Sequence, residues 1–382
     1  MLRFLTVSCC LLPGLLLAEE SGYRKSVFNG ENLHGWHVTG CQTQVEDGNL
    51  VIVDGDGFVR TDHKYGDFVL ELSWRPRRDE KWDSGIYIRC DLPSGDRPWP
   101  KQYQINLLQG DEGNLIGFPQ GRSKGLVKAG EWNRMKLTAR GESAAMEING
   151  QAAWSVTGLE QSQGYIGIQC EVPGGGEFEF KDIYVTELDQ ESLFNGKDLA
   201  GWEGGGQEAS LCWQVEDGLL LCTGEKGPWL RSKQEYDNFN FRLDYKLKEG
   251  GNSGVYVRVA KDGAHRDPGQ GTEVQILDDA AERYKKLKAG QYCGSVYLIA
   301  AATMHVGRAP GEWNSMEIDC QGHSYLIRHN GTIIVDAVAS EFPALKERRS
   351  AGFLGLQNHS EEVRFRDIRI GPSMRAASGL SE

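Results

Sequence analysis

Three short segments in the second half of this 382-residue chain place polar and ionisable side chains at alternate positions. Successive side chains of a β-strand point to opposite faces of a sheet, so the apolar members of each segment are expected in a core. These apolar members are Val255, Val257, Val259, Val274, Ile276, Leu354 and Leu356. The side chains then expected on the opposite face are Asn252, Tyr256, Arg258, Glu273, Gln275, Gln357 and His359.

The outward set contains the groups that proton-transfer chemistry needs. Glu273 and His359 can exchange protons with a bound molecule, and Arg258 can stabilise a developing negative charge. If the three strands are neighbours, their side chains line one polar, partly aromatic surface suited to sugar hydroxyls. The alternative is that these residues are polar because they face water.

The sequence of the chain is duplicated, and the strands that position these residues belong to its second copy. Seven segments recur in the same order, namely 26–30 and 192–196, 33–36 and 199–202, 44–48 and 214–218, 84–89 and 253–258, 130–133 and 311–314, 149–150 and 330–331, 180–183 and 365–368. We therefore expect two domains, at residues 24–188 and 190–371, followed by a tail at 372–382. Because almost no linker joins them, we expect them to pack closely.

The two copies differ at the groups that exchange protons. Aligning the copies pairs Glu273, His359 and Asn252 with Gln102, Glu171 and Asp83. The other outward residues persist, in that the first copy carries Tyr87, Arg89, Gln104 and Gln169. This asymmetry favours chemistry in the second copy alone, although neutral drift of a structural copy explains it equally well.

The pattern along each copy indicates an all-β fold. Residues 239–247 alternate apolar and polar at every step, which predicts a half-buried strand, and residues 68–74 are the weaker counterpart. Asp-Gly and Asn-Gly pairs stand where hairpin turns are needed. The one helix-like stretch is 280–289. Many short strands separated by turns predict a two-sheet sandwich or jelly roll.

The first residues and the charge set the expected compartment and exclude some partners. Arg3, an apolar run over residues 4–17 and Ala18 form a secretory signal, so we expect cleavage near Ala18 and export to the periplasm or the extracellular space. No second apolar run is long enough to span a bilayer, so no transmembrane segment is expected in the mature chain. The net charge of -12 argues against nucleic acid and anionic membranes as partners.

Cysteines and acidic pairs leave two questions open. Seven of the nine cysteines follow the signal, an odd number, and either Cys212 with Cys222 or Cys90 with Cys170 can form a disulfide. The pair Asp278-Asp279 beside Glu273 leaves a divalent cation open as a cofactor. His265 and His305 lack partners at zinc-like spacing, so we interpret them as ordinary loop or strand histidines.

The second copy resembles the 3-keto-disaccharide hydrolase domain family over nearly all of residues 190–371. The segments that carry the resemblance are FNGKDLAGW, WQVEDG, GNSGVYVR, TEVQILDD, GSVYLIA, APGEWN, NGT and GFLGLQNHSEEVRFRDIRI. The first copy is a divergent member, with DSGIYIR, QYQINLL and GIQCEV at three of these places. The resemblance implies a concanavalin-like jelly roll that cleaves glycosides whose glucosyl C3 has been oxidised to a ketone.

The implied chemistry suits the outward residues. A C3 ketone acidifies the C2 proton, so a base can form an enolate that expels the aglycone, and water then adds back. Glu273 and His359 are assigned as base and acid in either order, with Arg258 stabilising the enolate or a hydroxyl, alone or with a bound cation. The residues expected to position the sugar are Asn252, Tyr256, Gln275, Tyr297 and Gln357. Competing hypotheses are a non-catalytic, lectin-like carbohydrate-binding protein and a structural or adhesive surface protein.

Overall fold

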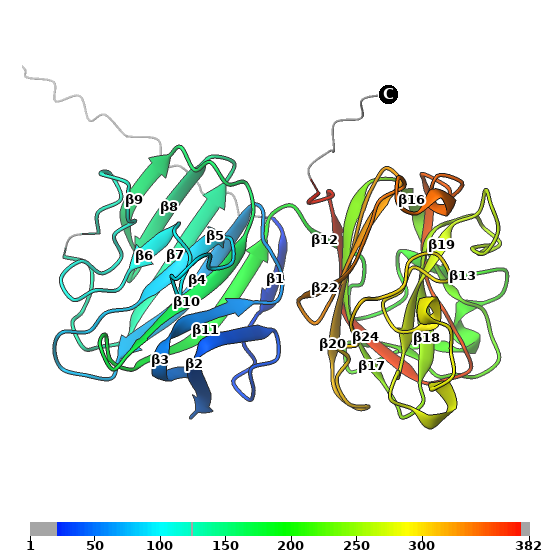
Figure 1. The fold of residues 1–382 in the computed structure, drawn as a ribbon, viewed down its shortest axis with the longest axis horizontal. Coiled ribbons are helices and arrows are strands. Elements are labelled where there is room, and N and C mark those ends of the chain that lie inside the picture. Colours follow the sequence, from blue (N-terminus) through cyan, green and yellow to red (C-terminus); the bar gives the residue numbers. More distant parts are fainter. Residues whose placement is uncertain (1–20, 124, 376–382) are drawn as a thin grey trace, which may run out of the picture.

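The computed structural model describes residues 21–123 and 125–375 and contains two β-sandwiches in tandem (Figure 1). The expected signal peptide at residues 1–18 and the end of the 372–382 tail lie outside the described residues. The regular secondary structure of the described chain is nearly all β-strand, and its helical elements are four 3₁₀ turns. In these residues no helix is long and apolar enough to cross a membrane.

The first sandwich is one continuous hydrogen-bonded sheet that curls over its own core. Its strands are β1 (Tyr23–Ser26), β2 (Trp36–Glu46), β3 (Asn49–Thr61), β4 (Phe68–Pro76), β5 (Gly85–Cys90), β6 (Gln104–Asn106), β7 (Asn133–Arg140), β8 (Ser143–Ile148), β9 (Gln151–Thr157), β10 (Tyr165–Val172) and β11 (Phe178–Glu187). The order is β6-β5-β10-β3-β11-β4-β7-β8-β9, with β1 on β11 and β2 on β3. β3 joins the two layers, because its first part pairs with β11 and its second part with β10.

The second sandwich has the same order of strands in two separate sheets. Its elements are β12 (Glu191–Ser192), β13 (Trp202–Gly204), η1 (Ala209–Leu211), β14 (Trp213–Glu216), β15 (Leu219–Cys222), β16 (Leu230–Tyr236), β17 (Phe239–Leu247), β18 (Asn252–Val259), β19 (Thr272–Leu277), η2 (Glu282–Tyr284), η3 (Ala289–Gln291), β20 (Asn314–Gln321), β21 (Ser324–His329), β22 (Thr332–Ala337), η4 (Pro343–Leu345), β23 (Gly352–Leu356) and β24 (Val363–Gly371). One sheet has the order β14-β15-β24-β17-β20-β21-β22, with β12 on β24, and the other the order β13-β16-β23-β18-β19.

These non-consecutive neighbours are the crossovers of a jelly roll, so the chain consists of two tandem jelly-roll sandwiches. The duplicated sequence also repeats unusual backbone geometry. The positive-φ pairs Arg89 and Arg258, with φ of 44° and 53°, and Asn149 and Asn330, with φ of 51° and 47°, occupy matching places in the two copies. The repeat detected in the sequence is thus a repeat of whole domains.

The strand expected at residues 239–247 is β17, with those bounds, but it is buried along both faces. Its apolar side chains enter the core of the second sandwich, as alternation predicts. Its polar side chains Asn240, Arg242 and Asp244 are also buried, because the first domain covers that face. The expectation of a half-buried strand was therefore wrong, since it took no account of the first domain packing against this face.

Two further expectations need correction. The stretch at 280–289, expected to be helical, is mostly loop. It contains the short 3₁₀ turn η2, and η3 begins at its last residue. The cysteines that the structure describes are all free thiols, so neither proposed pair forms a disulfide here. Cys90 and Cys170 belong to different apolar clusters, one on each side of the sheet that contains β5 and β10, so these two thiols do not meet.

The domains meet through buried charges. Glu187, at the end of β11, accepts hydrogen bonds from Arg242 (2.6 Å) and Arg369 (2.8 Å) of the second domain. The His63 imidazole of the first domain contacts the Glu317 carboxylate at 2.7 Å. Each of these side chains is less than a tenth exposed. The close packing expected from the short linker is thus achieved mainly by ion pairs.

Candidate functional site

The register of β18 and β19 brings two of the predicted site residues together. Tyr256 lies directly opposite Glu273, and Gly254 lies opposite Gln275. Opposed residues of an antiparallel pair share a face, and this face is the one away from the core, because Val255 and Val274 form the neighbouring inward pair. The outer face of the five-stranded sheet therefore carries Tyr256, Glu273 and Gln275, as alternation predicted.

The loop between β18 and β19 folds back over this face and adds His265. Its imidazole stacks on the Tyr256 ring, with centroids 4.6 Å apart and planes 24° from parallel. His265 Nε2 lies 3.1 Å from Glu273 Oε2, an ion-pair distance, although the angle is not that of a hydrogen bond. The Glu273 side chain is 3% exposed and that of His265 13%. His265 was interpreted from the sequence as an ordinary loop residue, and the structure places it at the centre of the candidate site.

The contacts of His265 fix where its protons lie. Its Nδ1 is 2.8 Å from the Gly263 carbonyl, which can only accept a hydrogen bond, so Nδ1 carries a proton. Burial opposes a charge on the ring, but the Glu273 carboxylate and the Gly263 carbonyl outweigh it and raise the pKa of His265. Burial, reinforced by the nearby Glu273 charge, raises the pKa of the Tyr256 phenol to about 12. The face thus holds a histidine–glutamate pair, in which the charged form of His265 is favoured, beside a protonated phenol.

Two more predicted residues, Gln357 and Tyr297, lie on this face beside Gln275. Gln357 donates from Nε2 to the Tyr256 hydroxyl at 3.1 Å, which leaves the phenol proton free for another acceptor. Tyr297 follows Val296, which bridges to Val274 in the core, so Tyr297 lies beside Glu273 on the outer face. Gln275 donates from Nε2 to the Gln291 carbonyl at 3.3 Å.

Trp229 is a member of this face that sequence reasoning missed. Its ring packs edge-on against Tyr256, with centroids 5.3 Å apart, and stays partly exposed. It lies against three glycines, Gly205, Gly263 and Gly355, none of which has room for a Cβ atom beside the indole. The signal for it was weak, because a tryptophan next to a proline in a loop carries no periodicity.

The placement of Arg258 on the outer face was wrong. The ladder between β18 and β23 shifts register between Tyr256 and Val259, and Arg258 has a φ of 53°. This bulge turns the buried Arg258 guanidinium toward Phe239 and Tyr325, where it donates to the carbonyls of Asp237 (2.7 Å) and Gly322 (2.5 Å). It is therefore a structural residue.

The same bulge reverses Val259 and is repeated in the first copy. Val259, expected in the core, packs with Tyr256 and Phe353 in a separate cluster on the outer face. In the first domain Arg89 donates to the carbonyls of Gly66 (2.9 Å) and Gly141 (2.5 Å). In both domains, therefore, the arginine at the bulge donates hydrogen bonds to backbone carbonyls of neighbouring connections.

Asn252 and His359 lie at the edges of the candidate site, at the start of β18 and beyond the end of β23. Asn252 begins β18, is 9% exposed, and its Oδ1 is buried without a hydrogen-bond partner among the described residues. His359 lies beyond the end of β23 in an exposed segment, and no hydrogen bond or ion pair in the described chain joins it to Glu273. The alternation that placed His359 with Gln357 does not extend past Leu356, where the strand ends.

The first domain keeps the shape of this face without its ion pair. Its Tyr87 lies opposite Gln104, as Tyr256 lies opposite Glu273, so the structural counterpart of Glu273 is Gln104 rather than Gln102. The Tyr87 hydroxyl donates to Gln104 Oε1 at 3.1 Å. The corresponding cluster is the one formed by Phe58, Tyr87, Cys90 and Tyr165 with Trp99 packed against it.

Two other places could in principle hold a ligand. Asp278 and Asp279 make hydrogen bonds with Gly250 N (2.8 Å) and Cys293 N (2.9 Å), and Asp279 also contacts His305 Nδ1 at 2.6 Å. Within residues 21–123 and 125–375, no group of three or more His, Cys, Asp or Glu side chains is arranged to hold a metal ion. Neither acid is therefore assigned as a metal ligand.

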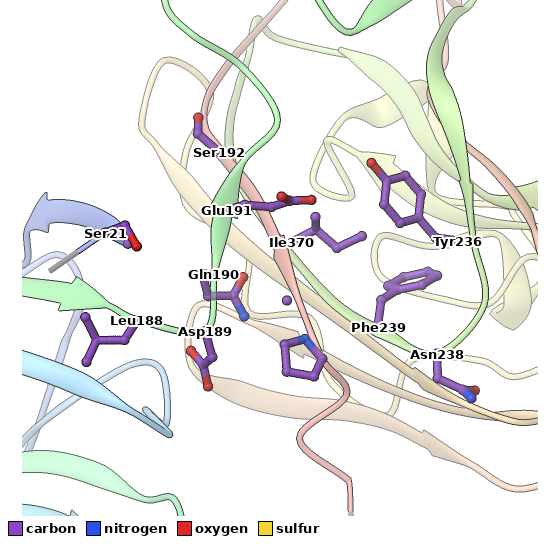
Figure 2. A pocket seen from close by; sticks show the side chains of 13 residues that line it. Ser21, Leu188, Asp189, Gln190, Glu191, Ser192, Tyr236, Asn238, Phe239 and Ile370 are labelled. Atoms are coloured by element: carbon purple, nitrogen blue, oxygen red, sulfur yellow. The ribbon is translucent and has the colours of Figure 1, made fainter. Parts of the chain in front are cut away.

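A cavity of about 610 Å³ lies where the linker meets the second domain (Figure 2). Asp189, Gln190, Tyr236 and Asn238 are among the side chains that line it. Burial raises the pKa of Asp189. The described lining residues include no histidine, lysine or arginine to partner a carboxylate in proton transfer. The outer face with Glu273 and His265 is the better candidate for chemistry.

The fold and this face define a β-sandwich protein with an acid–base pair and aromatic side chains on one sheet. Comparison with known families matches the chain twice, at residues 24–186 and 189–371, to the 3-keto-alpha-glucoside-1,2-lyase-like domain. The chain therefore belongs to this family, a family of glycoside-acting enzymes.

Individual relatives are more distant. A 3-keto-disaccharide hydrolase of Bacteroides thetaiotaomicron is 23% identical over 235 residues, which cover 50% of this chain and 78% of the relative. A crystal structure of a candidate glycosyl hydrolase from Parabacteroides distasonis is 29% identical, with a TM-score of 0.43, and covers 48% of this chain and 98% of its own. A carbohydrate-binding module of Bacillus subtilis is 15% identical, with a TM-score of 0.32, and covers 45% of this chain and 95% of its own.

Proposed function

We propose that the second domain cleaves the glycosidic bond of 3-keto-glucosides or 3-keto-disaccharides by elimination followed by hydration. The observation that carries the proposal is the Glu273–His265 ion pair, with His265 stacked on Tyr256, on the outer face of the five-stranded sheet. The family and the named relative supply the substrate class. The geometry supplies a base, an acid and a hydrogen-bond donor on one face.

The reaction needs one proton removed and one supplied. Glu273, as the carboxylate of the pair, takes the C2 proton made acidic by the C3 ketone. The electron pair forms the enolate, and its collapse breaks the C1–O bond to the aglycone. His265, whose pKa the contacts with Glu273 and Gly263 raise despite burial, supplies a proton to the departing oxygen. Water then adds to C1 of the unsaturated sugar and C2 regains a proton, which completes a net hydrolysis.

Tyr256 stabilises the enolate oxygen in this proposal. Its pKa near 12 keeps the phenol protonated, and the hydrogen bond from Gln357 leaves its own proton available. A donor aimed at developing negative charge lowers the barrier more than it stabilises the ground state. Trp229 offers a partly exposed aromatic surface on which a pyranose ring can stack. Gln275 and Tyr297 lie beside Glu273 and complete the sugar contacts.

The first domain supports fold and surface rather than chemistry. Gln104 stands in place of Glu273 and has no acid–base function, and its amide is tied to Tyr87 and, from Nε2, to Gln169 at 2.7 Å. Trp99 packs over the same cluster. We therefore place the site in the second domain. The proposal also keeps export through residues 1–18, which N-terminal sequencing of the secreted protein tests.

The test measures release of free sugar from 3-keto-trehalose and from a 3-keto-glucoside, with and without a chelator. We expect turnover by the wild-type chain and a loss of about 1,000-fold or more in kcat for Glu273→Gln, because loss of a positioned base removes general catalysis and its alignment. His265→Ala should lose about 100-fold. Gln104→Ala in the first domain is the matched control and should keep full activity.

Other outcomes decide against parts of the proposal. If His359→Ala loses activity while His265→Ala retains it, His359 is the acid and the pair described here is structural. Full activity of folded Glu273→Gln excludes Glu273 as the base. Binding of an unoxidised glycan without any product from keto-sugars would instead establish the lectin-like alternative. Loss of activity with chelator would show that a cation takes part.

A further inference from the structure

Two cysteines of the first domain meet at the corner where β3 passes from one layer to the other. Cys41, on β2, lies opposite Gly55 in the β2–β3 ladder. Cys170, on β10, directs its Sγ to the carbonyls of Gly55 (3.2 Å) and Asp54 (3.4 Å). Both cysteines therefore contact the same corner residue from opposite sides of β3.

Glycines remove the side chains that would otherwise separate these thiols. A Cβ atom on Gly55 would lie 3.0 Å from Cys41 Cα and 3.5 Å from Cys41 Cβ. Gly57, which pairs with Cys170, has its open side filled by the backbone of Thr39 and Cys41. β2 thus crosses over the corner in direct contact with it. The thiol–thiol contact lowers the pKa of Cys41 and raises that of Cys170.

The second domain bridges the same corner with a different side chain. Asn358 follows Gln357 as Cys170 follows Gln169, so it occupies the matching position. Its Nδ2 donates to the carbonyls of Glu225 (2.8 Å) and Gly227 (3.3 Å), in the segment that joins β15 to β16. In both sandwiches, therefore, the residue after the matching glutamine contacts backbone carbonyls at the corner. The contact is made by the amide of Asn358 in the second domain and by the thiol of Cys170 in the first.

We propose that Cys41 and Cys170 form a disulfide under oxidising conditions and covalently tie β2 across the corner to β10. The oxidant is a low-molecular-weight disulfide. Half-buried Cys41, as the thiolate, attacks one sulfur of the oxidant and releases its partner as a thiol. Cys170, losing its proton to solvent, then attacks Cys41 Sγ and releases the second thiol. Two electrons pass to the oxidant, and the other five described cysteines stay reduced.

This inference does not depend on the proposed function, because both cysteines lie in the first domain. The test uses the full chain, purified with reductant and then treated with oxidised glutathione. After alkylation in denaturant and digestion without reductant, mass spectrometry should find a peptide pair joined through Cys41 and Cys170. Alkylation of both thiols, or a stable glutathione adduct on Cys41 of the wild-type chain, overturns the proposal.

Two variants separate the steps. Cys170→Ser should accumulate glutathione on Cys41, because no second thiol resolves the adduct, and Cys41→Ser should give neither adduct nor linked peptide at this corner. Cys212→Ser is the matched control and should keep the linkage. The oxidised wild-type chain should also unfold at a higher temperature than the reduced one, because the bond limits the unfolded chain. That difference should vanish in Cys41→Ser, and its persistence there counts against the proposal.

Discussion

The His265 imidazole has two contacts that favour its charged form, the Glu273 carboxylate and the Gly263 carbonyl. Its raised pKa means that the ion pair stabilises the fold fully below the unfolded-state value of about 6.5 and that this contribution is lost as pH rises through the folded-state value. We predict that Glu273→Gln lowers the pKa of His265. An NMR titration of the ring protons, assigned with His265→Ala, measures it, and an unchanged titration would contradict the pairing.

Trp229 tests whether the outer face binds a sugar ring. We predict that Trp229→Ala raises KM by about 10-fold, because a stacking contact contributes roughly 0.5–1.5 kcal/mol, and changes kcat much less. Steady-state kinetics with a 3-keto-glucoside measure both constants. Trp99→Ala, the change at the corresponding cluster of the first domain, is the control and should leave both unchanged. A fall in kcat with constant KM would instead assign Trp229 to the chemistry.

Among the individual site residues, the sequence predicted the positions of some and not of others. Alternation placed Tyr256, Glu273 and Gln275 on one face because β18 and β19 are regular where they pair. Alternation failed for Arg258, because a bulge after Tyr256 reverses the face to which the following side chains point. Residue types alone do not reveal such a bulge. Alternation missed His265, because a loop has no period and only the folded chain shows which strand the loop returns to.

Arg348 holds the part of the loop that carries His265. Arg348 donates to the carbonyls of Asp267 (2.7 Å) and Arg266 (2.9 Å) and reaches that of His265 at 3.4 Å. This residue follows η4, in a connection that is 14 residues long between β22 and β23 and 7 residues long between β9 and β10. The longer connection of the second domain therefore supports the loop that carries His265.

We predict that Arg348→Ala lowers kcat by about 10- to 100-fold and moves the pKa of His265 toward its ordinary value, because a small displacement of a catalytic group has a large cost. Kinetics and the same NMR titration measure the two effects. Arg348→Lys should rescue only in part, since an ammonium lacks the guanidinium fork. Arg349→Ala is the control, because Arg349 Nε donates to Ala351 outside the loop. Equal losses in both variants would indicate general destabilisation.

The residues that form strands were more predictable from the sequence than what covers each face of a strand. β17 matches the predicted residues 239–247 because its alternation is complete, and the hairpin turns fall at Asn-Gly and Asp-Gly pairs such as Asn149 and Asn330. The burial of both faces of β17 could not be foreseen from the alternation of its own residues. Polar residues that face water and polar residues that face a charged partner domain give the same pattern, and the difference lies in side chains such as Glu187 from far along the chain.

At the scale of the whole molecule, the first domain completes the charge balance of the second. Arg242 and Arg369 are 1% and 0% exposed and share the carboxylate of Glu187. Arg242 also donates to the Lys64 carbonyl at 2.8 Å, and Lys25 pairs with Asp367 at 3.1 Å. A buried guanidinium without its carboxylate is costly, so the second sandwich depends on the first for its stability.

Glu187 gives the test of this dependence. We predict that Glu187→Gln destabilises the chain by about 3–5 kcal/mol, because removal of one partner leaves buried arginines uncompensated. Urea unfolding measures it, and Glu191→Gln, a change at an exposed position of β12, is the control. Burial opposes ionisation of Glu187, but Arg369 and Arg242 outweigh it and lower its pKa. Its stabilisation is therefore complete above the ordinary carboxyl pKa of about 4.3 and is lost as pH falls through the folded-state value. The variant should show a weaker loss of stability in acid than the wild type, and parallel acid profiles would mean that the domains are held by other contacts.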